Sequence, residues 1–395
     1  MKPNEPAIKI PYGTKDFLPA EARGKRVLEE KLATQFGSWG YEEVVTPTME
    51  YLQTLTTGTG LDLSEQMFVL FDRSNRILAL RPEMTIPIAR LAATRLREKP
   101  LPLRLFYLTN VFRHEEAQAG RQCEFHQAGV ELMGASEPSA DAEVIGLAIS
   151  AALAAGLRDF RICLGQVDFI NGIMADGGLS EQERQEIKQC LVKRDLVGLE
   201  RTTKLSGLTN EKQAAICQIP LLSGGREALS AARDLVTNSA SRAALDNLEA
   251  IFELLHAYGL QQYVSFDLGI IRDFDYYTGM VFEGYTPGLG FPFCGGGRYD
   301  RMLASFGLEC PATGFAMGIE RLLLALNRQG LNQQEGMRDV YVSWQEGKLL
   351  EAIAATRRLR EDGAVVELSP IAELRAKAEQ NQRQRGFREL LYIGE

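Results

Sequence analysis

The chain has 395 residues, of which 45% are hydrophobic and 24% are charged, and its formal net charge is −8 at pH 7. This length allows two or three domains with a substantial core, and the acidic balance argues against a dedicated nucleic-acid-binding protein, because phosphate binding needs an excess of positive charge. The sequence has no apolar run near the ~20 residues that cross a bilayer and no signal-peptide core, so we expect a cytoplasmic protein without a membrane segment.

The cysteines and histidines give no indication of a metal site. Six cysteines are present without a CxxC pair or a zinc-ligand spacing, and reduced, buried thiols are the default in a cytoplasmic protein. The only histidines are His114, His126 and His256, which excludes a histidine-rich metal site. We therefore expect no metal and no cofactor.

The first predicted element is a helix over residues 20–39, because apolar residues recur at helical spacing between Val27 and Phe36. A strand at residues 41–45 follows and ends before Pro47. Taken alone, this helix is an ordinary amphipathic core helix.

A β-hairpin is predicted next, with strands at residues 103–107 and 125–132 joined by a polar loop. Alternation places Gln127, Gly129 and Glu131 on one face, where a core would carry aliphatic side chains. Buried polar groups of this kind need a partner, and a small polar ligand is one solution. An exposed hairpin with ordinary surface residues is the alternative.

Three further regions follow the hairpin. Residues 179–258 are rich in Glu, Lys, Gln, Ala and Leu, which predicts a helical insertion between sheet strands. The segment IRDFDYYTGMVFEG at residues 271–284 leads into a strand, and GFAMGIERLLLAL at residues 314–326 predicts a strand that runs into a helix.

The last region predicts a small α/β unit. Its expected strands are residues 340–344, 364–368 and 390–393, and its expected helices are residues 349–359 and 371–384. Basic and acidic residues are equal in number from Arg338 to the end, so the unit has no electrostatic excess with which to hold phosphates.

Several of these segments together resemble the class II histidyl-tRNA synthetases. The matching strings are FRHEEAQAGRQCEFHQAGVE at 112–131, the two segments at 271–284 and 314–326, YGTKDFLP at 12–19, LRPEMT at 80–85 and GGGRYD at 295–300. The resemblance covers most of residues 9–326.

This resemblance implies an α+β fold: a class II aminoacyl-tRNA synthetase-like, mainly antiparallel sheet of six or seven strands, flanked by helices. It implies a core over residues 1–326, with the helical insertion at about 179–258. Residues 327–395 are then a reduced α/β domain similar to a truncated anticodon-binding domain. The helix at 20–39 lies where class II proteins place a dimer contact.

The resemblance also implies a histidine pocket. Histidine presents an ammonium, a carboxylate and an imidazole, so its pocket needs a carboxylate, a cation and polar partners for the ring. At family-matched positions Glu83 takes the ammonium with support from Thr85, and Arg272 takes the carboxylate. The residues that the resemblance implies for histidine binding are Glu83, Thr85, Arg113, Gln127, Glu131, Arg272, Tyr276 and Tyr277.

The nucleotide-binding loop departs from the synthetase pattern. Where those enzymes usually read RHERPQxGRYREFHQ, this chain reads RHEEAQAGRQCEFHQ, with changes at Glu116, Ala117, Gln122 and Cys123. Two positive charges are lost and a negative one is gained, and one unit charge at ~4 Å is worth roughly 4 kcal/mol at an effective dielectric of ~20. We therefore expect weak ATP binding, a vestigial nucleotide site at Arg121 and Arg321, and no catalytic residue. An ordinary surface arginine is the alternative for Arg121.

This combination is similar to the regulatory subunits of ATP phosphoribosyltransferase, a histidyl-tRNA synthetase-like family. Met84, where the synthetases usually have glycine, and Asp273 after the pocket arginine are typical of that family. The resemblance implies a non-catalytic subunit that activates a short catalytic subunit, a glycosyltransferase, at the first step of histidine biosynthesis. It also implies a self-dimer through the class II core and histidine as effector, and it gives no reason to expect tRNA binding.

Two other functions remain open on the sequence. The first is an active histidyl-tRNA synthetase that uses Arg113, Arg272 and Arg321 as its phosphate and transition-state cations. The second is a stand-alone histidine-binding sensor, which would not co-purify with a phosphoribosyltransferase. Two nearby residues have ordinary interpretations: we expect His126 to be a packed structural histidine and Cys294 a buried thiol, since no adjacent base is evident.

Overall fold

The computed structural model describes residues 9–57, 61–114, 122–270, 276–331 and 338–394. The chain separates into two compact units. The larger unit comprises the chain up to Asp16 together with Lys25–Leu331, and the smaller unit comprises Asn332–Glu395, with which Phe17–Gly24 is grouped.

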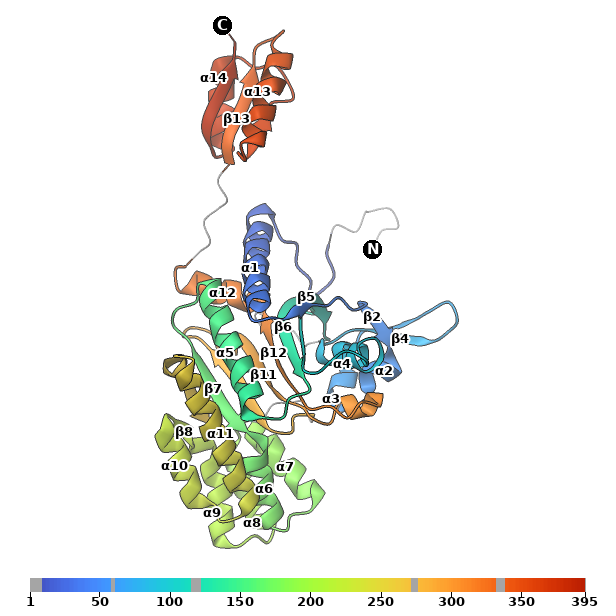
Figure 1. Ribbon diagram of the computed structural model, residues 1–395, viewed down its shortest axis with the longest axis vertical. Coiled ribbons are helices and arrows are strands. Elements are labelled where there is room, and N and C mark those ends of the chain that lie inside the picture. Colours follow the sequence, from blue (N-terminus) through green and yellow to red (C-terminus); the bar gives the residue numbers. More distant parts are fainter. Residues whose placement is uncertain (1–8, 58–60, 115–121, 271–275, 332–337, 395) are drawn as a thin grey trace. The chain divides into compact units, whose positions relative to one another are not determined.

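A large mixed sheet organises the larger unit (Figure 1). Its nine strands in the described residues have the order β1-β5-β6-β12-β11-β10-β7-β9-β8, and neighbours are antiparallel except for the parallel pairs β1–β5 and β7–β9. The strands are β1 (Glu42–Glu43), β5 (Leu103–Phe112), β6 (Glu124–Met133), β7 (Arg161–Gln166), β8 (Ser223–Gly224), β9 (Val264–Asp267), β10 (Met280–Tyr285), β11 (Cys294–Arg298) and β12 (Ala312–Gly318). The predicted fold class is confirmed, but the predicted strand number is wrong. Strand β1 lies within the strand predicted at residues 41–45, whereas β8 is a pair of residues, too short to give an alternating pattern in the sequence.

One face of the sheet is covered by helices and is mainly apolar, although it also buries an ion pair between Arg298 and Asp141 at 2.9 Å. The helices are α1 (Pro19–Ser38), α5 (Pro138–Ala155) and α12 (Ile319–Arg328). Side chains of β6 alternate: Ala128, Val130 and Leu132 are buried in this helix-covered core. Helix α5 is long and apolar enough to cross a membrane, but 67% of it is buried inside the protein, so its composition is that of a core helix.

A second core covers the other face of the sheet near β5 and β6. Helix α4 (Thr85–Thr94) lies there with the short helices α2 (Leu52–Thr56) and α3 (Leu61–Glu65). A three-stranded antiparallel sheet of order β2-β4-β3 completes this side, with β2 at Met49–Tyr51, β3 at Val69–Phe71 and β4 at Ile77–Leu80. Tyr107 and Tyr299 are buried in this second core.

The predicted helical insertion consists of helices, most of which have a side-chain N-cap. Its elements, with α6 leading in, are α6 (Val167–Asp176), α7 (Glu181–Val192), α8 (Leu196–Leu205), α9 (Asn210–Gln218), α10 (Arg226–Leu235) and α11 (Ser239–Ala257). Ser180 and Glu183 form a capping box at α7, and Asn238 caps α11 by accepting the backbone N–H of Ser241 at 2.7 Å. Such caps satisfy backbone donors that a helix start leaves unpaired.

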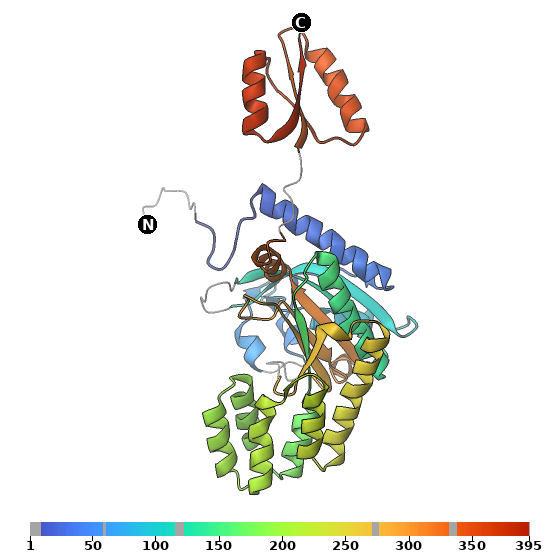
Figure 2. The same ribbon diagram turned by 90° about the vertical axis from the view of Figure 1, so that its left-hand side faces the viewer.

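The smaller unit is a three-stranded parallel sheet of order β14-β13-β15 with one helix on each face (Figure 2). Its elements are β13 (Arg338–Trp344), α13 (Leu349–Glu361), β14 (Val366–Leu368), α14 (Arg375–Gln384) and β15 (Phe387–Ile393). Helix α13 packs on β14 and β13, and α14 packs on β15 and β13.

Candidate functional site

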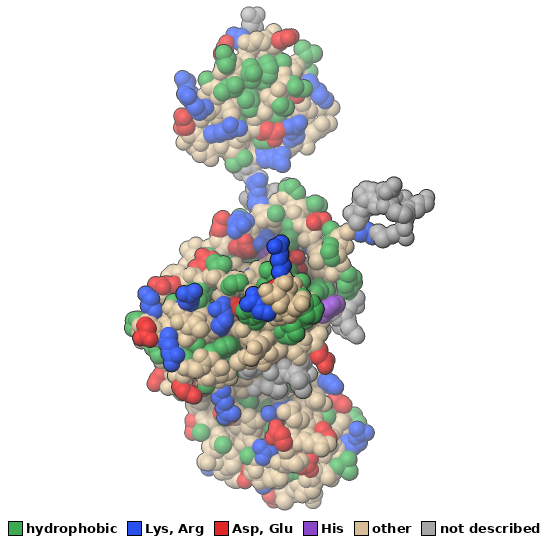
Figure 3. Space-filling model, turned by 90° about the vertical axis from the view of Figure 1, so that its right-hand side faces the viewer, with side chains coloured by type: hydrophobic (Ala, Val, Ile, Leu, Met, Phe, Trp, Pro, Cys, Tyr) green, Lys and Arg blue, Asp and Glu red, His purple; other side chains and the backbone are tan. Residues whose placement is uncertain are grey.

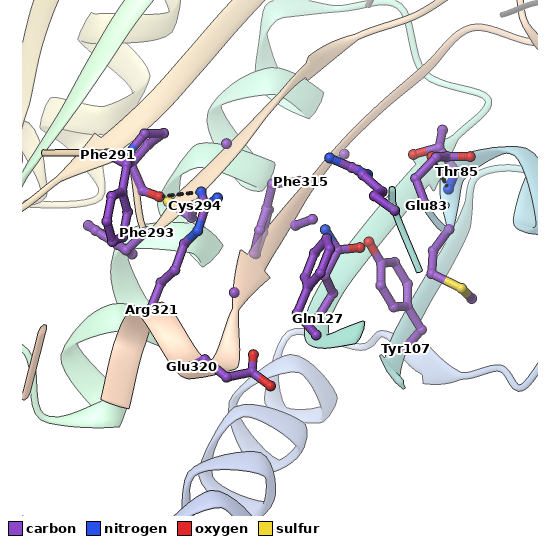
Figure 4. Close-up of a pocket in the computed structure, with 18 of the residues that line it drawn as sticks. Glu83, Thr85, Tyr107, Gln127, Phe291, Phe293, Cys294, Phe315, Glu320 and Arg321 are labelled. Carbon is purple, nitrogen blue, oxygen red and sulfur yellow. Dashed lines mark hydrogen bonds between the residues drawn. The ribbon is translucent and has the colours of Figure 1, made fainter. Parts of the chain in front are cut away.

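A cavity of about 290 Å³ lies on the face of the large sheet opposite α5. Its walls come from β5, β6, β11 and β12 and from the first residues of α4 and α12. Figure 4 shows Glu83 and Thr85 at one end and Phe291 and Arg321 at the other. We call these the acidic end and the guanidinium end.

Glu83 is fixed at the acidic end by the start of α4. Its carboxylate accepts the backbone N–H of Thr85 at 2.7 Å and of Ile86 at 2.8 Å, and only 4% of the residue is exposed. Burial raises the pKa of Glu83 above its ordinary value, while the two backbone donors and the charge of Arg113 act in the opposite direction. The carboxylate is thus held in place before any ligand arrives and can accept further hydrogen bonds from a cation.

Glu131 lies beside it and is held by hydroxyl groups. The Thr85 hydroxyl donates to Oε1 at 3.0 Å, and the Tyr299 hydroxyl donates to Oε2. Burial raises the pKa of Glu131 to about 8, against the effect of both hydroxyl donors, and the nearby charge of Glu83 raises it further. Gly314 leaves room for this carboxyl group, because a Cβ there would be 2.0 Å from Oε2.

Gln127 projects from the same face of β6, close to Tyr107 (Figure 4). Its Oε1 atom is buried and, among the described residues, has no hydrogen-bond partner. Gly129 separates Gln127 from Glu131, and a Cβ at Gly129 would be 2.4 Å from the Tyr107 hydroxyl and from the Phe315 carbonyl oxygen. An orphaned buried acceptor in a cavity points to a donor supplied by a ligand or by water.

Tyrosine rings form the wall near Glu131. The rings of Tyr276 and Tyr277 are 4.8 Å apart, and Tyr276 meets Tyr299 edge-on at 5.9 Å. Tyr277 also packs on β11, where Gly297 is required because a Cβ would be 2.9 Å from the Tyr277 ring.

Two arginines of the cavity are bound to the chain itself: Arg113 near Glu83, and Arg321 at the guanidinium end. Arg113 donates from Nε to the Pro82 carbonyl oxygen at 2.8 Å, and its guanidinium lies 5.5 Å from the centre of the Phe125 ring. Arg321 donates from Nη1 to the Pro292 carbonyl oxygen at 2.8 Å, drawn as a dashed line in Figure 4, and lies 5.0 Å from the centre of the Phe291 ring. Both guanidiniums are therefore positioned by a carbonyl and an aromatic face.

Glu320 is the carboxylate of the guanidinium end. It accepts the backbone N–H of His126 at 3.0 Å and contacts the His126 Nδ1 atom at 2.7 Å. His126 therefore has a structural partner on α12 and points away from Glu131.

The cavity brings together most of the predicted site. It is lined by seven of the eight residues that were predicted to bind histidine: Glu83, Thr85, Arg113, Gln127, Glu131, Tyr276 and Tyr277. Arg321 also lines it, whereas Arg272 and Arg121 lie outside the described residues. In the described part of the chain, no group of three or more His, Cys, Asp or Glu side chains is placed to hold a metal ion.

Sequence reasoning missed Tyr299, Tyr107 and Glu320, which also line the cavity. Tyr299 belongs to the GGGRYD string, so a motif signal was present, but its hydrogen bond to Glu131 joins residues that are far apart in the chain. Tyr107 reads as a core aromatic residue on an apolar strand.

Two of the altered loop residues can be placed. Gln122 lines the cavity, and Cys123 is 5% exposed and donates its backbone N–H to the Gly13 carbonyl oxygen at 2.7 Å. Where the synthetases carry a second loop arginine, this chain therefore has a small buried thiol. Glu116, Ala117 and Asp273 lie outside the described residues.

Comparisons with known proteins identify the family. The family model for histidyl-tRNA synthetase matches residues 13–322. The ATP phosphoribosyltransferase regulatory subunit of Moorella thermoacetica is 47% identical over 389 residues, covering 98% of each chain, and that of Desulforamulus reducens is 43% identical, covering 98% of this chain and 96% of the relative.

A solved structure gives the same result. The crystal structure of an ATP phosphoribosyltransferase regulatory subunit/histidyl-tRNA synthetase from Bacillus halodurans C has a TM-score of 0.89 and 34% identity, and covers 98% of this chain and 99% of that chain. The chain therefore belongs to the family of ATP phosphoribosyltransferase regulatory subunits, which shares the fold of the histidyl-tRNA synthetases.

Proposed function

We propose that this protein is the non-catalytic regulatory subunit of ATP phosphoribosyltransferase. It activates a short catalytic subunit in the cytoplasm and allows histidine to inhibit the first step of histidine biosynthesis. Similarity over nearly the whole length to relatives of that name supports this function. The glycosyl transfer itself belongs to the catalytic subunit, and the regulatory chain needs no cofactor.

The observation that carries histidine sensing is the pair of buried carboxyl groups in one cavity, at Glu83 and Glu131. Glu83 has the position and the fixed geometry to accept the ligand ammonium. Gln127 and Glu131 are four residues apart on one strand, or about 13 Å at ~3.3 Å per residue, so they meet different ends of a ligand. In this arrangement Glu131 faces the imidazole, and Arg113 together with Arg272 provides charge for the ligand carboxylate.

The same cavity is a poor site for adenylation. Activating histidine with ATP requires several cations around the α-phosphate, and the buried thiol of Cys123 replaces one of them. Arg321 donates to a main-chain carbonyl oxygen. We therefore regard Arg121 and Arg321 as remnants of a nucleotide site, and the smaller unit as a reduced anticodon-binding domain that does not bind tRNA.

Self-association through the larger unit is part of the proposal. The outer face of the β2-β4-β3 sheet exposes apolar side chains, with Met49 at 53%, Tyr51 at 42% and Leu70 at 39% exposure. Figure 3 shows hydrophobic side chains on this side of the larger unit. An apolar patch of this kind favours association. Leu70→Glu should lower the oligomeric state measured by sedimentation, whereas Leu205→Glu, at an equally apolar but separate exposed position, should not.

The deciding experiment adds the purified protein to the isolated short catalytic subunit and measures ATP-dependent phosphoribosyl transfer with and without histidine. We expect activity to rise when the protein is added and to fall when histidine is added. The variant Glu83→Gln should still activate the catalytic subunit but should lose inhibition by histidine. A catalytic subunit that gains nothing from the protein would overturn the proposal, and so would histidine-dependent pyrophosphate exchange at ordinary synthetase turnover.

A further inference from the structure

We propose that Glu131 and the imidazole ring of bound histidine share a single proton, so that histidine affinity is highest near neutral pH and declines on both sides. This inference rests on the proposed function, since it concerns the ligand at the same site. It follows from the difference between the two buried carboxyl groups of the acidic end.

Glu83 and Glu131 are held by different kinds of donor. The partners of Glu83 are two backbone N–H groups, which can only donate, so its acceptor role is fixed. The partners of Glu131 are the hydroxyls of Thr85 and Tyr299, which can donate or accept. In the described part of the chain no lysine or arginine forms an ion pair with Glu131. Glu131 can therefore stand in this pocket either as a carboxylic acid or as a carboxylate.

Among the residues that the structure describes, the titratable groups that face Glu131 do not supply the missing charge. Glu83 approaches from the start of α4 and adds negative charge, Tyr107 approaches from β5, and Tyr299 with Tyr276 closes the other side. Burial raises the pKa of Tyr107 and of Tyr299 well above the ordinary value, so both stay neutral at physiological pH. The charge of Arg113 lowers the pKa of Glu83.

When an imidazole ring binds beside Glu131, the ring nitrogen and the Glu131 carboxyl group together hold one proton. A neutral ring offers an unprotonated nitrogen, to which the Glu131 carboxyl group donates. If the proton crosses to the ring, an imidazolium faces a carboxylate. Both arrangements contain one proton for the pair, and a buried pair that shares a proton titrates as a unit.

The pH dependence follows from counting protons. The unliganded protein holds one proton on Glu131 below pH about 8, and free imidazole gains one below about 6.5. Between these values binding exchanges no net proton. At higher pH the complex must take up a proton, and at lower pH it must release one, so affinity changes by up to about tenfold per pH unit on each side.

Isothermal titration of histidine into the full-length protein tests this count. At pH 7.2, two buffers with different ionisation enthalpies should give the same heat, which means no net proton exchange. At pH 8.5 the same comparison should show uptake of most of one proton. The variant Glu131→Gln should lose that uptake, which separates it from titration of the ligand ammonium.

Tyr299→Phe is the decisive variant. The Tyr299 hydroxyl lowers the pKa of Glu131, so its removal should move the alkaline decline in affinity to higher pH. Tyr258→Phe, at a half-exposed ring outside the cavity, is the matched control and should leave the profile unchanged. A merely structural role for Tyr299 would weaken binding at every pH without moving the profile.

Two results would overturn the inference. Release of one proton at pH 7.2 with binding intact would mean that an ionised Glu131 accepts from a neutral ring, and it would leave the proposed function untouched. An absence of histidine binding would overturn both this inference and histidine sensing, while activation of the catalytic subunit would still be measured separately.

Discussion

The two ends of the cavity differ in how their charged groups are held. At the acidic end, Glu83 and Glu131 accept hydrogen bonds from the chain and keep acceptor positions directed at the cavity. At the guanidinium end, Arg321 donates to the Pro292 carbonyl oxygen and lies on the Phe291 ring. Preorganised groups add affinity because their ordering cost is met on folding. The chain therefore holds the charged groups of both ends in place, and the ends differ in the charge that they present to a ligand: carboxyl groups at one and the Arg321 guanidinium at the other.

The largest effect should come from removing charge at the acidic end. Glu83→Gln keeps the shape and one acceptor of the side chain but removes its negative charge, and loss of a buried charged partner costs about 2–4 kcal/mol of binding, or roughly 30- to 1000-fold in Kd. Histidine titration calorimetry measures this loss. Glu320→Gln makes the same chemical change at the guanidinium end and should alter the Kd by less than about threefold. Equal losses in the two variants would remove the proposed distinction between the ends.

A larger side chain at Gly314, which contacts the Glu131 carboxyl group, should have the next largest effect. In Gly314→Ala the new Cβ would be 2.0 Å from Glu131 Oε2 and 2.5 Å from the Val130 carbonyl oxygen, so the carboxyl group must move. We expect a loss of unfolding free energy of about 1–3 kcal/mol from overpacking, together with weaker histidine binding. Gly290→Ala, where a Cβ meets nothing within 4 Å, is the control for both measurements. Unchanged histidine affinity in Gly314→Ala would show that the position of Glu131 is unimportant.

The sequence predicted the acidic end well because its residues occur in short strings. Glu83 and Thr85 belong to one such string, and alternation on a single strand places Gln127 and Glu131 on one face. Contacts between distant segments leave no such local signal. The hydroxyl of Tyr299 reaches Glu131 across the sheet, and it contributes to a protonation behaviour that neither segment has by itself.

The sequence predicted the fold class correctly but predicted strand β5 too short. Strand β5 continues to Phe112, whereas the prediction ended at Tyr107, because the added residues include the polar Thr109 and Asn110. Their side chains are satisfied by distant partners: Asn110 donates to Glu124 at 2.8 Å, and both contact Arg81. Tertiary hydrogen bonds can therefore extend a strand through residues whose local pattern does not favour one.

The pH dependence of stability should report the protonation state of Glu131 at the acidic end. The pKa of Glu131 rises from 4.5 to about 8 on folding, so between these values the folded state binds more protons than the unfolded chain, and stability falls as pH rises. From pH 6 to 7.5, the unfolding free energy of the wild type should fall by about 2 kcal/mol relative to Glu131→Gln. Urea unfolding at the two pH values measures this change. A difference that does not vary with pH would mean that Glu131 is ionised throughout.

The smallest effect concerns the segment beside the altered loop. Gly13 has a φ of +72°, and a Cβ there would be 2.4 Å from the Cys123 sulfur, whereas Gly178 has a φ of +70° with nothing within 4 Å. Each Gly→Ala change costs about 1 kcal/mol for the left-handed backbone. Only Gly13→Ala adds a clash, which we expect to cost about 1 kcal/mol more. Urea unfolding compares the two variants, and histidine affinity should be unchanged in both because neither residue lines the cavity. Equal unfolding costs would mean that the buried Cys123 thiol moves to make room for the new methyl group. A larger side chain would then also fit at position 123. Packing would therefore not explain why this chain lacks the synthetase arginine there.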